Sequence, residues 1–148
     1  MSDHKRSLPR SLWWSAGSVV LMVVGAFGPW ASVADLVTVH GTDGASDGWI
    51  VVGAAAVAVI AMLFYRRQRR WLLVLPLLAG IAGAATTAYD ISNANELASS
   101  ELFGSIVSVE WGIYVALAGS ISLALSSLGL MFERRGRAGA PSELPSGA

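Results

Sequence analysis

His40, Asp43 and Asp47 form the densest group of side chains in this sequence that could coordinate a cation. Imidazole nitrogens and carboxylate oxygens are ordinary metal ligands, but this spacing matches no established metal motif. We therefore expect no metal and no cofactor, and treat the three residues as candidates for binding a ligand or a partner. The sequence contains no cysteine, which excludes disulfides, thiol catalysis and thiolate metal sites.

Asp90 and Glu110 are the other carboxylates of interest, because each stands at the end of an apolar stretch. Asp90 follows Tyr89, and Glu110 precedes Trp111. A carboxylate near bilayer depth can bind a proton or a cation, whereas the simpler interpretation is an interfacial residue that ends a membrane span. A carboxylate at a helix start is also favoured by the helix dipole. We expect no ionisable residue inside any span, which argues against a proton-coupled transporter or an ion pump.

Hydroxyl groups within the apolar stretches are the remaining groups that could act as nucleophiles. No histidine or lysine base lies at their depth, so the logic of a catalytic triad fails and we predict that the protein is not an enzyme. Bonding to backbone carbonyls or to neighbouring helices is the expected role. These residues are Thr86, Thr87, Ser120, Ser122, Ser126 and Ser127.

Four long uncharged stretches must position these side chains. The hydrophobic fraction is 54% and the charged fraction is 14%, well below the roughly 25% that is usual in soluble domains. A helix rises about 1.5 Å per residue, so each stretch approaches the length needed to cross a ~30 Å hydrocarbon core. The sequence predicts an all-α membrane protein, a four-transmembrane-helix bundle over residues 12–132, with spans at about 12–30, 49–65, 71–89 and 111–132.

The charged residues predict how the chain is oriented. All 10 lysines and arginines lie in the N-terminal segment 1–11, in the turn Arg66–Arg70 or in the tail 133–148, while both long loops carry only acids. The positive-inside rule then places both termini in the cytoplasm of a cell whose plasma membrane the chain crosses. Tryptophans and tyrosines near the span ends, Trp30 among them, fit interfacial belts. The tail, rich in Gly, Pro and Ser, is expected to be disordered.

An alternative concerns the first span. Basic residues, an apolar stretch from Ala16 to Gly28 and then Ser32-Val33-Ala34 also resemble a secretory signal with a cleavage site. Cleavage would leave three spans and an outside N-terminus. We favour retention, because the run is long for the apolar core of a signal.

Small residues predict how the helices pack, and β-prone loops predict a sheet outside them. Stripes of small side chains allow close approach in lipid; we expect such packing for the third and fourth spans and favour neither outcome for the first two. Pro76 is expected to bend the third span. The two outward loops can form a small β-sheet, from Val33 to His40 and from Leu102 to Val109, with a turn from Gly41 to Gly44; Asn93 to Ser100 fits a short helix instead. The stripes are Gly112, Ala116, Ser120 and Ala124 in the fourth span, Ala79, Gly83 and Thr87 beside Gly80 and Ala84 in the third, Ala54 and Ala58 in the second, and Gly17 and Gly25 in the first.

Three short motifs carry a resemblance. They are Gly28-Pro29-Trp30, Asp47-Gly48-Trp49 and Trp111-Gly112-Ile113-Tyr114. With them the chain resembles small four-pass membrane proteins of unknown function from actinobacteria, a resemblance that implies no activity or site. The layout is also similar to claudin-like proteins with an extracellular sheet, although the cysteine pair of that family is absent, so the similarity is architectural.

These observations predict a non-enzymatic accessory or scaffold protein that binds a partner in the membrane or cell envelope. Its expected partners are the lipid bilayer and a membrane or envelope protein, or a second copy of itself, and no nucleic-acid signature is present. The alternative is a small homo-oligomeric transporter or channel. Tyr89, Asp90, Glu110, His40, Asp43 and Asp47 are the candidate binding residues.

Overall fold

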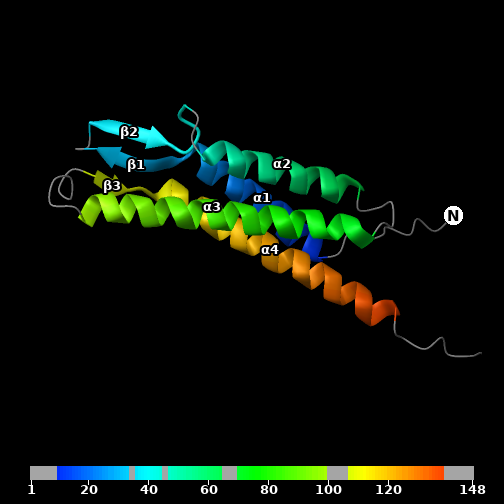
Figure 1. Ribbon diagram of the computed structural model, residues 1–148. Helices are drawn as coiled ribbons and strands as arrows, with labels where there is room; N and C mark the ends of the chain where they lie inside the picture. Colours follow the sequence, from blue (N-terminus) through cyan, green and yellow to red (C-terminus); the bar gives the residue numbers. More distant parts are fainter. Residues whose placement is uncertain (1–9, 34–35, 45–46, 65–69, 100–106, 139–148) are drawn as a thin grey trace, which may run out of the picture.

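The computed structural model describes residues 10–33, 36–44, 47–64, 70–99 and 107–138 (Figure 1). Most of this chain is helical, with a small three-stranded sheet, in agreement with the predicted mixture. The basic turn at 65–69, the tail from 139 onwards and Ala34 of the possible cleavage site lie outside the described residues. The elements are α1 (Arg10–Phe27), β1 (Pro29–Val33), β2 (Val37–His40), α2 (Gly48–Phe64), η2 (Arg70–Leu73), α3 (Val74–Ser99), β3 (Val107–Val109) and α4 (Trp111–Ala138).

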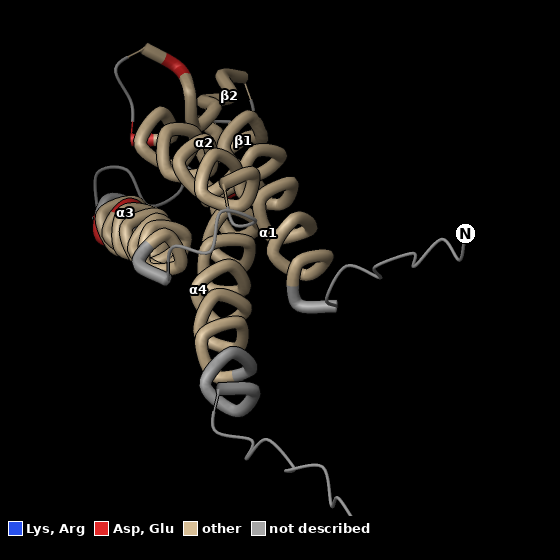
Figure 2. The backbone as a smooth tube through the Cα atoms, turned by 90° about the vertical axis from the view of Figure 1, so that its right-hand side faces the viewer, with Lys and Arg blue, Asp and Glu red and all other residues tan. Residues whose placement is uncertain are grey.

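The four helices run side by side, with the sheet at one end (Figure 1). Helix α1 packs most extensively on α4 and also on α2, while α3 packs on α4 and α2. Viewed along the helices, Figure 2 shows the four arranged around a common axis. Arg10, Arg70 and the arginines of the last turns of α4 belong to the helix ends far from the sheet. Apart from Glu133 in the last turns of α4, the acids of the described residues lie toward the sheet, so acids and arginines are largely separated along the helices.

Within the part of the chain that the structure describes, two helices are long and apolar enough to cross a membrane. They are Val74–Glu96 within α3 and Trp111–Phe132 within α4, with mean hydropathies of 1.4 and 1.9. The apolar parts of α1 and α2, Leu12–Phe27 and Gly48–Phe64, are shorter. By length and composition the third and fourth predicted stretches could therefore cross a membrane, whereas the first two are shorter than this test requires, so the prediction of four spanning helices is supported for two of them.

The predicted first span, 12–30, is too long, because α1 ends at Phe27. Proline 29 has no N–H group to donate to the carbonyl of Gly25, four residues earlier. The indole Nε1 of Trp30 donates to that carbonyl instead, at 2.9 Å. This bond draws the Trp30 side chain into the core, where it is 8% exposed, so its assignment to an interfacial belt is wrong.

The third and fourth helices are longer than predicted. Helix α3 continues from Tyr89 to Ser99, because the segment after Asp90 contains no glycine or proline to break it. Asp90 consequently lies inside the apolar segment Val74–Glu96, and the expectation that every span is free of ionisable residues is wrong. Helix α4 extends to Ala138 and so includes the start of the predicted tail.

Pro76 does not interrupt a helix. It occupies the first turn of α3, directly after η2, and not the interior of a span. The backbone N–H groups of a first helical turn have no partner within the helix, so proline is tolerated there without a break. The bend predicted from this residue therefore has no physical cause.

The predicted small-residue stripes of α3 and α4 lie at helix contacts. A methyl group added at Gly80 would come within 2.7 Å of the backbone nitrogen of Ala124, and one at Gly83 within 2.6 Å of the Ser120 hydroxyl. Gly25 of α1 is equally tight, since a methyl there would overlap the backbone of Ala116. Gly17 differs, because an added methyl would meet nothing within 4 Å. The packing predicted for α3 and α4 is confirmed, and in α1, for which the sequence favoured neither outcome, Gly25 is packed and Gly17 is open.

Large apolar side chains cover the outside of the helices as well as filling the core. Among the described residues, five hydroxyl side chains of the helices are buried with that core. Leu63 is 73% exposed and Leu125 is 63% exposed. The buried hydroxyls belong to Ser15, Ser18, Thr87, Ser120 and Ser127.

Candidate functional site

The sheet at one end of the helices joins both outward segments of the chain. Its strand order is β2-β1-β3, and both pairings are antiparallel. The predicted β-prone segments supply β2 and β3. Strand β1, in the centre, comprises Pro29 and Trp30, which the sequence assigned to the first span, and residues 31–33, which it assigned to the first outward loop. Its β structure follows from Pro29, which ends the helix and permits only extended or turn conformations nearby.

Glu110 is anchored to this sheet. Its Oε1 accepts a hydrogen bond from the Ser32 hydroxyl at 2.8 Å and one from the Ser108 hydroxyl at 3.3 Å. The two hydroxyls are themselves 2.6 Å apart, across the β1–β3 pairing. The backbone N–H of Glu110 donates to the carbonyl of Trp30 at 2.9 Å. This carboxylate therefore ties the start of α4 to the central strand, and neither serine was identified from the sequence.

His40 and Asp43 form a small exposed turn. The Asp43 Oδ2 accepts a hydrogen bond from the backbone N–H of His40 at 2.6 Å and lies 3.3 Å from His40 Nδ1. The backbone hydrogen bond lowers the pKa of Asp43 below its ordinary value. The turn ends at Gly44, whose φ of 66° is the left-handed conformation that glycine adopts without a steric cost. The predicted turn from Gly41 to Gly44 is confirmed.

Asp47, just before α2, and Asp90, within α3, lie close to each other. Asp47 directly precedes α2, and its side chain interacts with that of Asp90 in α3. One carboxylate oxygen of Asp90, Oδ2, is shielded from solvent and has no hydrogen-bond partner among the described residues. The neighbouring Tyr89 points outward and is 65% exposed.

The six candidate residues thus fall into separate groups at the sheet end of the molecule. Among the described residues, no group of three or more histidine and acidic side chains is arranged to hold a metal ion. The red segments of Figure 2 mark where the described acids lie on the backbone. The structure pairs His40 with Asp43 and Asp47 with Asp90, and it attaches Glu110 to the sheet.

Strand β2 leaves one edge of the sheet exposed. Each of its four residues is exposed, and its pairing in the described chain is with β1 alone. Leu36, just before the strand, is 87% exposed, and Val37 is 58% exposed. An exposed apolar edge strand presents unpaired backbone groups and is a template for pairing with another chain.

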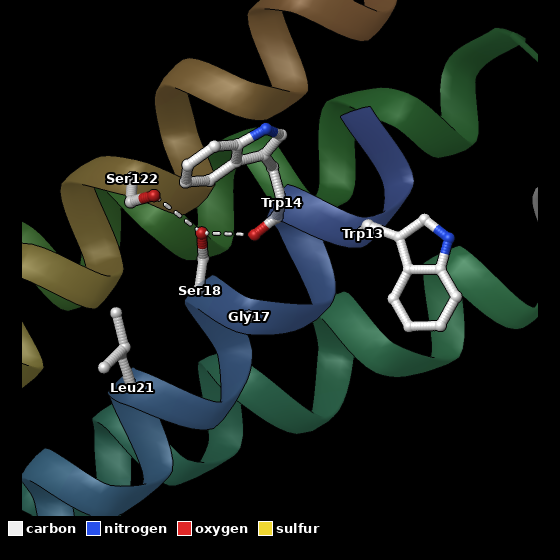
Figure 3. A pocket seen from close by; sticks show the side chains of 6 residues that line it. All are labelled: Trp13, Trp14, Gly17, Ser18, Leu21 and Ser122. Atoms are coloured by element: carbon white, nitrogen blue, oxygen red, sulfur yellow. Dashed lines mark hydrogen bonds between the residues drawn. The ribbon is translucent and has the colours of Figure 1, made fainter. Parts of the chain in front are cut away.

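A shallow groove lies at the opposite end, between α1 and α4. It has a volume of about 460 Å³ and is lined by Trp13, Trp14, Gly17, Ser18, Leu21 and Ser122. In Figure 3 the Trp14 ring lies on the α4 side, near Ser122, while the Trp13 ring extends the other way. The sequence assigned the tryptophans to an interfacial belt and did not identify the groove.

Hydroxyl pairs fasten α1 to α4 beneath this groove. Ser18 and Ser122 share a hydrogen bond of 2.8 Å, and Ser15 and Ser126 share one of 3.0 Å. Ser18 also bonds to the carbonyl of Trp14 at 2.8 Å. Serine hydroxyls bonded to neighbouring helices or to carbonyls were predicted for α4; serines at 15 and 18, one helical turn apart, were the overlooked signal.

Comparison with known proteins found no matching protein family, no similar curated protein and no similar solved structure.

Proposed function

We propose that this chain is an integral membrane protein whose four helices cross the bilayer as a bundle, with both termini in the cytoplasm. The outside of the helices supports this proposal, since large apolar side chains such as Leu63 and Leu125 are exposed while serines are buried. Lipid tails solvate such a surface, whereas water does not. The separation of arginines and acids at opposite helix ends supports the orientation.

We propose that α1 and α2, although short for a span, also cross the membrane. Trp13 and Trp14 near the start of α1 are exposed, as is Trp49 at the start of α2, and exposed indoles favour the headgroup region. Helix α1 also supplies the most extensive contact with α4, so we propose that it is retained and not removed as a signal. N-terminal sequencing of the membrane form tests this, and a chain starting at Asp35 would contradict it.

The activity we propose is non-enzymatic binding of a membrane or envelope protein. The observation that carries it is the exposed β2 edge with Leu36 and Val37. An extended segment of a partner can add to such an edge, because backbone hydrogen bonds supply affinity and side chains of alternate residues supply specificity. The sheet is held to α4 through Glu110, so it presents this edge on a rigid support.

Crosslinking in native membranes tests the proposal. We expect a discrete partner to be captured by the full chain, and capture to fall when Leu36 and Val37 are both replaced by lysine. Both side chains are exposed, so the double variant should fold. Asn93→Lys, an exposed change on α3 near the same end, is the matched control. A chain that elutes alone, or capture that survives the Leu36 and Val37 changes, would contradict partner binding by this edge.

A small homo-oligomeric transporter or channel is the second candidate. The shielded, unpartnered Oδ2 of Asp90 beside Asp47 favours it, because a carboxylate inside a span is a candidate proton or cation site. Flux into liposomes should then fall with Asp90→Asn and remain with Glu110→Gln, whose carboxylate is bonded to the sheet. Absence of flux, or flux that Asp90→Asn leaves unchanged, would remove this candidate.

A further inference from the structure

We propose that the groove between α1 and α4 binds one acyl chain of an anionic phospholipid, with the lipid headgroup at the arginine-bearing ends of the same two helices. This inference rests on the proposed membrane location. It adds to that location a specific lipid site, at the end of the molecule opposite the sheet.

The lining of the groove selects an apolar occupant. Its polar side-chain atoms are the indole nitrogens of Trp13 and Trp14 and the hydroxyls of Ser18 and Ser122. The two hydroxyls are bonded to each other and, for Ser18, to the Trp14 carbonyl (Figure 3), so both hydroxyl protons can be used within the helix pair. The rest of the lining is indole, leucine and glycine, so a polar solute would gain little there, while an alkyl chain would be sheltered on these surfaces.

The shape of the lining favours a flexible chain over a helix of another protein. Trp13, Gly17 and Leu21 follow one another at four-residue intervals along α1, so the open surface at Gly17 is a notch between two bulky side chains. Close helix packing in lipid needs a continuous stripe of small residues. A notch of this kind suits an acyl chain, which bends to fill it.

The charge at this end of the helices selects an anionic headgroup. Arg10 is the first residue of α1, within about 12 Å along the axis from Ser18 at 1.5 Å per residue. Helix α4 runs antiparallel to α1, as the Ser18–Ser122 and Ser15–Ser126 pairs show, and its last turns contain Arg134, Arg135 and Arg137. Basic residues next to a span attract anionic lipid. The exposed indoles of Trp13 and Trp14 lie at the depth where such residues meet headgroups.

Lipid binding by the full chain in detergent, followed by native mass spectrometry, tests this site. Phosphatidylglycerol and phosphatidylcholine with identical acyl chains are the two probes. We expect phosphatidylglycerol to bind at least about fivefold more tightly, the factor that about 1 kcal/mol for one arginine near the lipid phosphate produces. Equal binding of both lipids would overturn the proposal.

Gly17→Leu adds a bulky side chain at a residue that lines the groove, and nothing lies within 4 Å of its Cβ. Gly53→Leu on α2, equally open, is the matched control. We expect Gly17→Leu to abolish the preference for phosphatidylglycerol and Gly53→Leu to preserve it. A preference that survives Gly17→Leu, or a copurifying protein that only Gly17→Leu releases, would overturn the lipid assignment.

Fluorescence in vesicles gives a second readout. Brominated phosphatidylglycerol in phosphatidylcholine vesicles should quench the indoles more than brominated phosphatidylcholine at the same content. The excess should vanish in a Trp13→Phe, Trp14→Phe variant and persist in a Trp49→Phe, Trp111→Phe variant. A uniform response would overturn the lipid site alone, whereas a chain absent from the vesicle fraction would overturn the membrane location on which it rests.

Discussion

The α1–α4 interface and the buried face of α2 solve the same packing problem differently. Between α1 and α4, Gly25 lies against the backbone of Ala116, and Ser18 bonds to Ser122. The buried face of α2 consists of alanines, Val51 and the opening Gly48, whose side chains offer no hydrogen bond. The comparison teaches that hydroxyl pairs and close backbone approach specify the α1–α4 interface, whereas the buried face of α2 has a close backbone approach at Gly48, against Gly41, and is otherwise a smooth surface of small side chains.

The sharpest test of this comparison adds one methyl group to α1 and one to α2. Gly25→Ala should destabilise the protein by about 1–3 kcal/mol, because the methyl overlaps the Ala116 backbone and the helices must separate. Gly53→Ala on α2 meets nothing within 4 Å and should be neutral or stabilising by up to about 1 kcal/mol. Unfolding in mixed micelles, followed by circular dichroism, measures both. Equal effects would remove the distinction between the interfaces.

Glu110→Ala extends the test to the contact between α4 and the sheet. Loss of the carboxylate removes the charged acceptor that the Ser32 and Ser108 hydroxyls share and leaves these hydroxyls their contact with each other, so we expect about 1.5–3 kcal/mol of destabilisation, as for hydrogen bonds to charged groups. Glu110→Gln keeps an acceptor oxygen and should cost less. The same unfolding assay applies, and a Gln variant as unstable as the Ala variant would show that the hydrogen bonds contribute little.

A double-mutant cycle on Ser18 and Ser122 measures the hydroxyl pair itself. Hydrogen bonds between helices in a membrane average about 0.6 kcal/mol of coupling energy and rarely exceed about 1.7. We expect Ser18→Ala and Ser122→Ala to show a coupling in this range. The cycle of Ser18→Ala with Val51→Ala, on the α2 face, is the control and should be additive. Additivity in the serine cycle would mean that the pair adds no specificity.

The smallest expected effect is at the exposed turn. The backbone N–H of His40 holds the pKa of Asp43 below its ordinary value, so the charged carboxylate stabilises the turn. This contribution is present above the pKa of the unfolded chain and is lost as the pH falls through the folded value. A carbon-detected NMR titration should show a lowered Asp43 pKa that returns to the ordinary value when the turn is opened by Gly44→Val. An ordinary pKa in the intact protein would contradict the hydrogen bond.

The sequence by itself determined the elements and their polarity. Gly28 and Pro29 predict a break after the first helix, and the β-prone residues around Val37 and Val107 predict strands, because these signals act through local backbone chemistry. The arginines and acids predict which helix ends lie on opposite sides of the membrane, because placing a charge in lipid is costly. The sequence does not predict that α3 extends past Asp90. An acidic residue at the end of an apolar stretch indicates the end of a membrane span, but it does not end the helix, and no glycine or proline follows that would.

Only the tertiary structure decided which side chains meet. The face of α1 that turns inward is set by its contacts with α4, so the packed Gly25 and the open Gly17 were not separated from the sequence, although Ser15 and Ser18 lie on the face that packs on α4. The same rotation of α1 pairs Ser18 with Ser122 and forms the groove beside Trp14. The approach of Asp47 to Asp90 likewise depends on how α2 lies against α3. These contacts join residues far apart in the chain, and they follow from helix packing as a whole and not from any local preference.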